Sequence, residues 1–429
     1  MKEIHIENEH GGLTIKQIKE SLAKSIQGRD FKKVLIIPPD ITRLQSGAGI
    51  LTSLYYDLLG GVNGQIDILP ALGTHAPMTR GEQITFFGDE IPEERFLVHD
   101  WRDGVTKIGE VPGEFVKEVS GGLMDENMDI EVSNYLLDPS YDLILSIGQV
   151  VPHEVVGMAN YTKNIVVGCG GSRFINQSHM LGALYGMERI MGKDNSPVRK
   201  VFDYAEEHFI SKLPVEYVLT VTVSEGEETD IIGLYIGKGR NGFTQAVALS
   251  QKHNLIYLDS PIKKCVVWLD EREFHSTWLG NKAIYRTRMA IADGGELIIL
   301  AQGVEMFGED AENDRLIRKY GYIGREAILN LCKTESDLQN NLSVAAHIIH
   351  GSTEERFGVT YATDKLTKDE VEAASFKYMP FDEAVKMYDP KQLKQGYNIM
   401  PDGTEIYFIE NPAIGLWATK DIGEAITNN

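Results

Sequence analysis

The feature that most constrains the fold is a series of short, uninterrupted apolar runs separated by helix-like segments. The runs occupy residues 32–40, 66–75, 141–150, 215–224, 230–237, 255–259, 263–270 and 295–303. Strands that are apolar on both faces are typical of parallel sheets covered by helices on both sides. The sequence therefore predicts an α/β protein with mainly parallel sheets flanked by helices.

Chain length predicts two domains. The chain has 429 residues, which is more than one hydrophobic core normally supports. The candidate boundary lies within 250–264, which gives an N-terminal α/β domain over 1–257 and a C-terminal α/β domain over 258–400. The tail, about 401–429, is expected to pack back on the first domain, and the active site is expected in the cleft between the two domains.

Two helices are predicted from apolar residues at helical spacing. One is "MLGALYGMERIMG", over residues 180–192. The other is "GNKAIYRTRMAIADGG", over 280–295, which ends in a glycine pair. The second is expected to lead directly into the strand over 295–303.

Charge and cysteine content exclude several classes of protein. The formal net charge is −21, from 63 acidic and 42 basic residues, and such a surface repels a polyanion such as nucleic acid. The three cysteines lie far apart without a C-x-x-C pair, which excludes a disulfide framework and a thiolate zinc cluster at the usual spacings. The polar start and the lack of an apolar run of about 18 residues predict a cytoplasmic protein without a membrane span. The oligomeric state stays open, a homo-oligomer included.

Ionisable residues follow three of the predicted strands, where parallel sheets usually carry their reactive groups. The first strand is followed by Asp40, Thr42 and Arg43, the second by His75 and the third by His153. A guanidinium there is suited to gripping a carboxylate or phosphate, and two histidines are suited to moving a proton on either face of a carbon. A single histidine is more often structural, and a single arginine is as often a surface residue. The prediction of one crevice therefore rests on their combination.

A glycine-rich loop lies between Lys163 and His179, and His153 precedes it. A lysine in this setting can bind phosphate as a point charge, or act as a nucleophile when its pKa is lowered. His179 lies near the start of a predicted helix and is a candidate metal ligand through its neutral imidazole. Because no cysteine cluster accompanies it, the other ligands of such a metal would come from elsewhere, for instance from a cofactor. The structural alternative is an ordinary loop with a solvated Lys163.

A competing signal occurs at residues 237–242, "GKGRNG". It matches G-x-G-x-x-G, follows a predicted strand and precedes a helix-like segment, and Asp259 ends the next strand. The pattern is typical of dinucleotide binding and makes an NAD-dependent dehydrogenase an alternative function. Lys238 and Arg240 count against it, because they stand where the backbone normally approaches a pyrophosphate.

A set of spaced motifs, in order, resembles the lactate racemase superfamily, whose members use a nickel-pincer nucleotide. "DITR" is similar to the family's D-x-T-R, and "GTHAPM" is similar to its G-x-H-R-P. The spacing of His153, Lys163 and His179 repeats the family's His–x9–Lys–x15–His. "GNKAIYRTRMAIADGGELIILAQG" is similar to the segment that carries a second substrate-binding lysine, here Lys282. The resemblance spans roughly residues 30–310.

For the cofactor, the resemblance implies four residues. Lys163 would hold the nickel-pincer nucleotide covalently through a thioamide, and His179 would be the protein ligand to nickel. Asp40 and Thr42 would help to seat the cofactor or to orient Arg43. The soft ligands to the metal would then come with the cofactor, which agrees with the lack of a cysteine cluster.

For the reaction, the resemblance implies inversion of C2 in a 2-hydroxy acid. His75 and His153 would be the paired acid and base on opposite faces of the substrate carbon. Arg43 and Lys282 would bind the substrate carboxylate, with Trp278 in the same pocket. One histidine would take the hydroxyl proton while the C2 hydrogen leaves as hydride, which returns to the other face. The implied partners are a small hydroxy acid and the enzymes that make the cofactor.

Two departures from the family pattern bear on these roles. Asn160 and Tyr161 stand where the family usually has a Gly-Gly pair before the lysine. Trp278 and Leu279 stand where the lactate enzymes commonly have Tyr and Gln, so the chain resembles the branch of sugar-acid 2-epimerases that act on gluconate or mannonate. Side chains near Lys282 that a polyol acid can use are His275, Ser276, Thr277 and Asn281.

Three hypotheses follow from the sequence. The favoured one is a nickel-pincer 2-hydroxy acid epimerase acting on a sugar acid, with lactate or another short-chain 2-hydroxy acid as the alternative substrate. The second is an NAD-dependent dehydrogenase, and the third is a non-enzymatic carboxylate-binding protein. The first predicts nickel and a covalent mass addition at Lys163, the second predicts stabilisation by NAD, and the third predicts neither.

Overall fold

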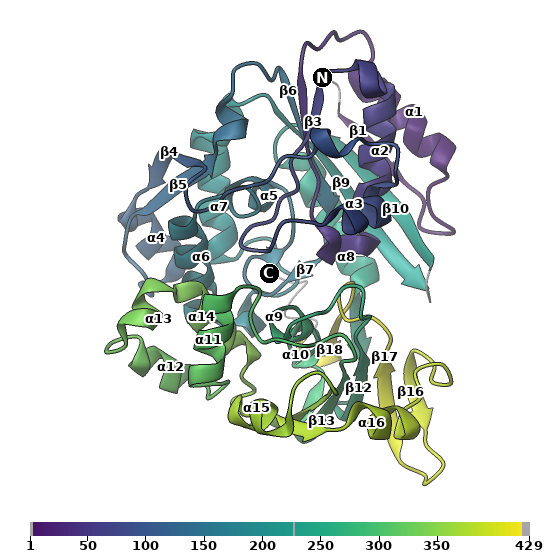
Figure 1. The fold of residues 1–429 in the computed structure, drawn as a ribbon, viewed down its shortest axis with the longest axis vertical. Helices are drawn as coiled ribbons and strands as arrows, with labels where there is room; N and C mark the ends of the chain where they lie inside the picture. Colours follow the sequence, from purple (N-terminus) through teal and green to yellow (C-terminus); the bar gives the residue numbers. More distant parts are fainter. Residues whose placement is uncertain (1–2, 226–227, 423–429) are drawn as a thin grey trace. The chain divides into compact units, whose positions relative to one another are not determined.

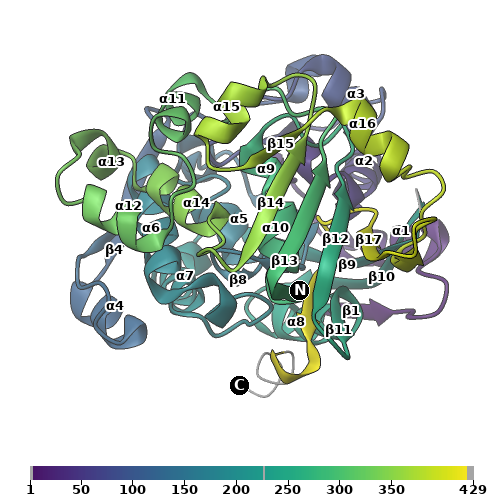
Figure 2. The same ribbon diagram turned by 90° about the horizontal axis from the view of Figure 1, so that it is seen from below.

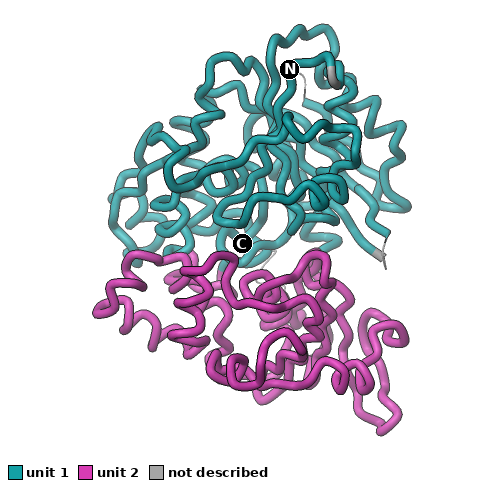
Figure 3. Tube along the Cα trace, in the orientation of Figure 1, with its two compact units in different colours: residues 1–181, 190–254 teal, residues 182–189, 255–429 magenta. Residues whose placement is uncertain are grey.

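The chain forms two compact units, seen here in a computed structural model that describes residues 3–225 and 228–422. Unit 1 comprises residues 1–181 and 190–254, and unit 2 comprises residues 182–189 and 255–429 (Figure 3). The division falls at 254/255, three residues before the expected boundary. The short excursion at 182–189 was not expected, because nothing in its composition separates it from the chain around it.

Unit 1 is built on a six-stranded sheet in the order β1-β10-β9-β6-β2-β3. Its strands are β1 (Ile4–Glu7), β2 (Val34–Ile37), β3 (Ile66–Ile68), β6 (Leu143–Gln149), β9 (Val215–Glu225) and β10 (Glu228–Gly237). The pairs among β3, β2, β6 and β9 are parallel, whereas β10 and β1 add as antiparallel strands. The predicted α/β class with mainly parallel strands is confirmed.

Each face of this sheet carries a hydrophobic core covered by helices (Figure 1). One face is covered by α1 (Ile15–Ile26), α2 (Ala48–Leu58) and α3 (Arg80–Phe87). The other is covered by α4 (Gly113–Ser120), α5 (Thr162–Val166), α6 (Ser172–Tyr185), α7 (Pro197–His208), α8 (Asn241–Asn254) and the hairpin of β4 (Val105–Val111) and β5 (Met128–Ser133). Because both faces are covered, the central strands carry apolar residues without alternation.

Unit 2 is built on a second six-stranded sheet in the order β15-β14-β13-β12-β17-β16, and Figure 2 shows β14, β13 and β12 side by side. Its strands are β12 (Ile262–Trp268), β13 (Ile291–Leu300), β14 (Phe357–Ala362), β15 (Lys377–Met379), β16 (Gly396–Ile399) and β17 (Glu405–Ile409). Only the β16–β17 pair is antiparallel among these described strands. A separate parallel pair joins β11 (Leu255–Leu258) to β18 (Leu416–Thr419).

The remaining elements of the two units are short. The helices of unit 2 are α9 (Thr277–Gly280), α10 (Lys282–Thr287), α11 (Ala311–Tyr320), α12 (Arg325–Leu331), α13 (Ser336–Asn340), α14 (Leu342–Gly351), α15 (Lys368–Ala373) and α16 (Phe381–Met387). The 3-10 helices are η1 (Ile41–Ser46), η2 (Gly61–Asn63), η3 (Glu93–Arg95), η4 (Asn134–Leu137), η5 (Met187–Arg189) and η6 (Ile210–Lys212). A two-residue pair, β7 (Pro152–His153) with β8 (Gly157–Met158), belongs to unit 1.

The tail belongs to unit 2, which corrects the expected packing on the first domain. β17 pairs parallel with β12, and its apolar residues from Ile406 to Ile409 are buried. β18 pairs with β11 in the same unit. The tail therefore completes sheets that the second half begins, and residues 423–429 of it lie outside the described residues.

The helix expected over 280–295 is much shorter in the structure. α10 ends at Thr287, and β13 begins at Ile291, which pairs with Ile262 of β12. The "IADGG" stretch therefore belongs to a strand. Pairing with the neighbouring strand outweighs the helical spacing of the apolar residues, a common tertiary override of local pattern.

The "GKGRNG" segment does not lie in a dinucleotide-binding unit. That motif requires a parallel strand–helix–strand crossover, whereas β10 pairs antiparallel with both β9 and β1. Arg240 donates to Asp194 Oδ2 at 3.3 Å and lies 3.4 Å from Asp203 Oδ2, so it ties this turn to the segment around α7. The NAD-dependent dehydrogenase hypothesis loses its structural basis.

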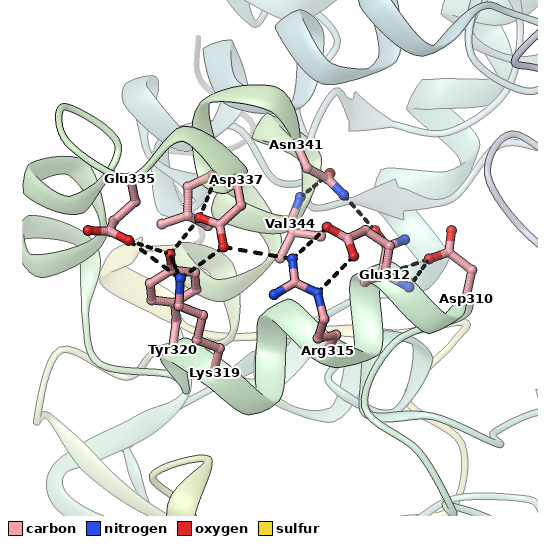
Figure 4. Close-up of polar contacts among 11 residues, drawn as sticks. Asp310, Glu312, Arg315, Lys319, Tyr320, Glu335, Asp337, Asn341 and Val344 are labelled. Carbon is pink, nitrogen blue, oxygen red and sulfur yellow. Dashed lines mark hydrogen bonds and ion pairs between the residues drawn. The ribbon is translucent and has the colours of Figure 1, made fainter.

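An exposed charge network joins α11 to α13 in unit 2 (Figure 4). Lys319 Nζ lies 2.9 Å from Asp337 Oδ2, Tyr320 donates to Asp337 Oδ1 at 2.6 Å, and Arg315 pairs with Glu312 at 2.7 Å. Exposed pairs of this kind each contribute only about 0–1 kcal/mol. The network therefore orients these helices without dominating the stability of the unit.

Within residues 3–225 and 228–422, no helix is both long and apolar enough to cross a membrane.

Candidate active site

The first strand of the parallel sheet delivers a buried carboxylate. β2 ends at Ile37, a Pro-Pro pair breaks the strand, and Asp40 then caps η1. Asp40 Oδ1 accepts hydrogen bonds from Thr42 N at 3.1 Å and from Thr42 Oγ1 at 2.6 Å. Aspartate is a favoured helix cap because its side chain satisfies the first N–H groups. Thr42 therefore fixes one carboxylate oxygen and leaves the other to a second partner.

That second partner is His75, which follows β3. His75 Nδ1 lies 2.6 Å from Asp40 Oδ2. Burial acts to raise the pKa of Asp40, but the combined effect of His75, Thr42 and Arg43 outweighs it, so the pKa is lowered overall. An ionised carboxylate only accepts, so His75 Nδ1 carries the hydrogen and its lone pair is on Nε2. His75 is thus in the tautomer that accepts a proton.

His153 has the opposite tautomer. It is buried in the β7–β8 hairpin, where its Nδ1 accepts a hydrogen bond from the backbone N–H of Val155 at 3.1 Å. An amide N–H only donates, so the hydrogen of the neutral ring is on Nε2, which lies 3.6 Å from Glu154 Oε1. His153 thus presents a hydrogen-bond donor on Nε2 where His75 presents a lone pair. The sequence analysis did not single out Glu154 as a residue of the site. Its position next to His153 in the sequence could have indicated it.

Lys163 lies in α5 directly after a strained turn. Asn160 has φ of 65° and Tyr161 has φ of 57°, a region that favours glycine. These are the two positions where the family pattern has Gly-Gly, so the backbone keeps a glycine-like conformation without glycine. Asn160 Oδ1 accepts from Tyr161 N at 2.7 Å, and Gly148 makes room for the Asn160 amide, because a Cβ there would lie 1.9 Å from Nδ2.

Position 161 should therefore accept glycine with a smaller loss of stability than alanine. The buried ring of Tyr161 stacks on Phe243 and packs at a tilt against Tyr217, so Tyr161→Ala is expected to destabilise the protein by about 3–5 kcal/mol. Tyr161→Gly loses the same ring but relieves the positive φ, and should be the more stable of the two by about 1 kcal/mol. Urea unfolding of the two variants measures the difference. A more stable alanine variant would contradict the strained conformation.

The amine of Lys163 is perturbed by its surroundings. Burial first, and then the charge of Arg43, lower the pKa of Lys163 to about 8. A buried ammonium is disfavoured relative to the neutral amine. A neutral amine is the nucleophilic form, so the site favours covalent chemistry at this lysine near neutral pH.

This shift predicts an unusual reactivity profile. Because the pKa of Lys163 is lowered, its neutral fraction should rise around pH 8, well below the ordinary lysine value of about 10.4. Pulse acetylation from about pH 6 to about pH 11, followed by peptide mass spectrometry, measures the midpoint. Exposed Lys200 in the same sample corrects for loss of reagent. A Lys163 midpoint near the ordinary value would refute the perturbation.

His179 has the properties of a metal ligand. It lies on α6, where its Nδ1 donates to the Ile175 carbonyl at 2.7 Å, which places the lone pair on Nε2. Burial lowers the pKa of His179 to about 4, so the ring is neutral at physiological pH. A backbone acceptor on one nitrogen and a lone pair on the other is the usual arrangement of a metal-binding histidine. In the described part of the chain, no group of three or more His, Cys, Asp or Glu side chains is placed to hold a metal.

Arg43 offers an anion-binding guanidinium. It sits at a kink in η1, with φ of −122° and ψ of 41°, and its side chain is half-buried. Its Nη1 is buried and has no hydrogen-bond partner among the described residues. A buried N–H without a partner is costly, which favours a bound carboxylate or phosphate at this position.

The structure brings the site residues of unit 1 together. The pKa of Lys163 responds to the charges of Arg43, Glu154 and Asp40 as well as to burial. The pKa of His179 responds, after burial and its backbone hydrogen bond, to Lys163, Glu154 and His75. Residues from three strand ends and the glycine-rich loop therefore lie near enough to influence one another electrostatically, and their joint action in one site stays a prediction.

Lys282 and Trp278 belong to unit 2, and their role in substrate binding stays a prediction. Lys282 is buried and its Nζ lies 3.1 Å from Glu273 Oε1, a partner that sequence reasoning missed. The Trp278 ring stacks on His347 with centroids 4.2 Å apart. The negative charge of Glu273 partly neutralises the positive charge that Lys282 would present to a substrate carboxylate.

Three of the four side chains expected to serve a polyol are engaged within unit 2. Their hydrogen-bond partners are Glu309 for Ser276, Tyr322 for Thr277 and Tyr361 for Asn281. Buried polar groups that are already paired contribute little to a new ligand. The Nδ2 of Asn281 is buried without a hydrogen-bond partner among the described residues. The sequence argument for a sugar acid therefore keeps His275, this amide nitrogen, the substitution of Trp278 and Leu279 and the motif likeness.

Comparison with known proteins agrees with this geometry. Residues 13–191 match the family described as the lactate racemase N-terminal domain. A crystal structure of a protein from Thermotoga maritima is 27% identical, covers 97% of this chain and 100% of that chain, and has a TM-score of 0.81. The lactate racemase apoprotein from Thermoanaerobacterium thermosaccharolyticum is 18% identical, covers 95% of this chain and 90% of that chain, and shares the fold with a TM-score of 0.65. No curated protein matches the chain.

Proposed function

We propose that this chain, which matches the lactate racemase N-terminal domain over residues 13–191, is an isomerase of that superfamily that inverts C2 of a 2-hydroxy acid. The observation that carries the proposal is the pair of histidines in opposite tautomers. His75 offers a lone pair on Nε2 and His153 offers a hydrogen on Nε2, in the crevice that also holds Lys163 and His179. An inversion that can run in either direction needs one group to accept a proton and another to donate one.

The residues fit a nickel-pincer nucleotide. Lys163 has a lowered pKa suited to covalent attachment, and His179 has its lone pair on Nε2 as a single protein ligand. The soft ligands to the metal would come with the cofactor, and in residues 3–225 and 228–422 no group of three or more His, Cys, Asp or Glu side chains is placed to hold a metal by itself. When bound, the cofactor supplies an acceptor for the C2 hydrogen, which is too weakly acidic for an imidazole to remove as a proton.

The side chains of unit 1 supply the remaining steps. Arg43 binds the substrate carboxylate through its buried Nη1 and so orients C2. His75 Nε2 takes the proton of the hydroxyl group, and Asp40 stabilises the imidazolium that forms. His153 presents Nε2 to the hydroxyl oxygen of the opposite configuration: as imidazolium it gives that oxygen its proton when the epimer forms, and in the reverse direction it takes the proton back.

The substrate class is a 2-hydroxy acid, with D-gluconate and lactate as the two members to compare. Trp278 and Leu279 in place of Tyr and Gln support a sugar acid. The engaged side chains of Ser276 and Thr277 support a smaller acid. Substrate assay decides between them.

The test is production of the protein together with the cofactor-making enzymes, followed by intact mass, nickel analysis and incubation with D-gluconate, D-lactate and L-lactate. The expected result is an adduct mapped to Lys163, bound nickel and appearance of the C2 epimer of one acid. Absence of both adduct and nickel would refute the cofactor assignment. An adduct without conversion of any 2-hydroxy acid would refute the reaction.

A further inference from the structure

A fully buried arginine holds the turn before Lys163. Arg199, on α7, is 0% exposed, and its Nη2 donates to the Met158 carbonyl at 2.6 Å and to the Asn160 carbonyl at 3.3 Å. Both acceptors belong to the strained segment that leads into α5. One guanidinium nitrogen therefore fixes two backbone positions, two residues apart, just upstream of Lys163.

The same helix contacts this segment on either side of Arg199. Ser196, the cap of α7, donates from Oγ to the Val156 carbonyl at 2.9 Å. Two turns along α7, Glu206 Oε2 accepts from Thr162 Oγ1 at 3.1 Å. Helix α7 therefore holds the chain from residue 156 to residue 162 at successive points, with Arg199 in the middle.

The burial of Arg199 is not explained by stability. Its Nε and Nη1 are buried without hydrogen-bond partners in the part of the chain that the structure describes, and its Cζ lies 4.5 Å from the centroid of the Phe243 ring. A buried cation with unsatisfied donors is destabilising relative to an apolar side chain of similar size. A group of this kind is expected where the backbone needs to be held in an unfavourable conformation.

The backbone that Arg199 holds is in such a conformation. Asn160 and Tyr161 both have positive φ, and strained residues persist only when their surroundings over-determine them. Arg199 hydrogen-bonds the backbone carbonyls on either side of Ala159. The ring of Tyr161 is held separately, by packing against Phe243 and Tyr217. The direction in which the next residues leave the turn sets where the Lys163 amine points.

We propose that Arg199 is a positioning residue for Lys163, which acts by holding the carbonyls of Met158 and Asn160 and thereby the strained turn. The inference rests on the proposed function, because covalent attachment of the cofactor is what requires the Lys163 amine to be held in one place. The positive charge of Arg199 acts in the same sense, since it is among the groups that lower the pKa of Lys163 after burial and Arg43.

The test compares Arg199→Met, Arg199→Lys and the matched control Lys200→Met in protein made without the cofactor-making enzymes. Lys200 is the neighbouring residue on α7 and is exposed, so its variant removes a charge from the helix but leaves the turn untouched. The measurements are hydrogen exchange of peptides over 156–163 and the pH midpoint for acetylation of Lys163. Neither requires the cofactor.

In Arg199→Met, amide exchange over 156–163 is expected to rise about tenfold, because the turn opens locally. The Lys163 midpoint is expected to move upward by about one pH unit, since both loosened burial and loss of charge favour the ammonium. Arg199→Lys, which keeps the charge and one donor group, should recover part of both effects. Lys200→Met should match the wild type.

A folded Arg199→Met protein with wild-type exchange and a wild-type Lys163 midpoint would overturn the proposal, as would equal changes in Lys200→Met. Should Arg199→Met fail to fold, Arg199→Gln is measured instead, with the same expected and contrary results. In co-production with the cofactor-making enzymes, Arg199→Met should also form the Lys163 adduct about ten to a hundred times more slowly. A wild-type protein that never forms the adduct would refute the proposed function, while the exchange and midpoint data still decide the role of Arg199.

Discussion

Replacing His179 with alanine is expected to remove nickel from the protein while leaving the covalent adduct on Lys163. The expectation follows from the separation of the two roles in the structure. His179 presents Nε2 because its Nδ1 is committed to the Ile175 carbonyl, whereas Lys163 reacts through an amine on a different element. Loss of a residue that only supports a metal ligand typically lowers metal affinity by about tenfold or more. Loss of the ligand itself should therefore lower the nickel content at least tenfold.

The measurement is nickel per chain by elemental analysis together with intact mass, in protein co-produced with the cofactor-making enzymes. Ser178→Ala is the matched control, because Ser178 lies one residue earlier on α6 and its Oγ also donates to the Ile175 carbonyl. This control should keep nickel and adduct. Retention of nickel in His179→Ala would show that His179 is not the ligand, and loss of the adduct in it would show that the two roles are not separate.

Replacing His75 with alanine is expected to lower kcat by about two to four orders of magnitude, the usual contribution of a general base. Asp40→Asn should have an effect of similar size, because an amide no longer enforces the tautomer with the lone pair on His75 Nε2. Both variants should keep the Lys163 adduct and nickel, since neither residue is proposed to bind the metal. Chiral analysis of the product in both directions measures the loss.

A surface pair provides the control for these two variants. His253 Nε2 lies 2.6 Å from Glu9 Oε2, with 23% of the histidine side chain exposed against 25% for His75. His253→Gln therefore removes a histidine–carboxylate pair of the same length and with a similarly exposed histidine, although the carboxylate of Glu9 is more exposed than that of Asp40. It should leave kcat unchanged. Full activity in His75→Ala would remove this histidine from the reaction.

Much of the first unit could be predicted from local pattern. The apolar runs marked the strands of both sheets, because a strand buried on both faces has no polar alternation. The position of Asp40, His75 and His153 after three such runs predicted one crevice, since parallel strands end at the same edge of a sheet. The family likeness then assigned roles that spacing alone left open.

Other features depended on partners far away in the sequence. Pairing of Ile291 with Ile262 turned the end of a predicted helix into a strand, and pairing of β17 with β12 drew the tail into unit 2. The antiparallel placement of β10 removed the basis of the dinucleotide motif, although the glycine spacing matched that motif. Strand partners are set by the competition of all strands for burial, which no local pattern contains.

The sequence by itself determined the strands, the chemical groups after them and the family, because these depend on residue type and spacing along the chain. Only the tertiary structure decided how those groups are tuned. The carboxylate of Asp40 and the backbone N–H of Val155 give His75 and His153 opposite tautomers. Burial shifts the pKa of Lys163 and of His179. Tautomer and pKa depend on neighbours and on exclusion from water, and both exist only once the chain has folded.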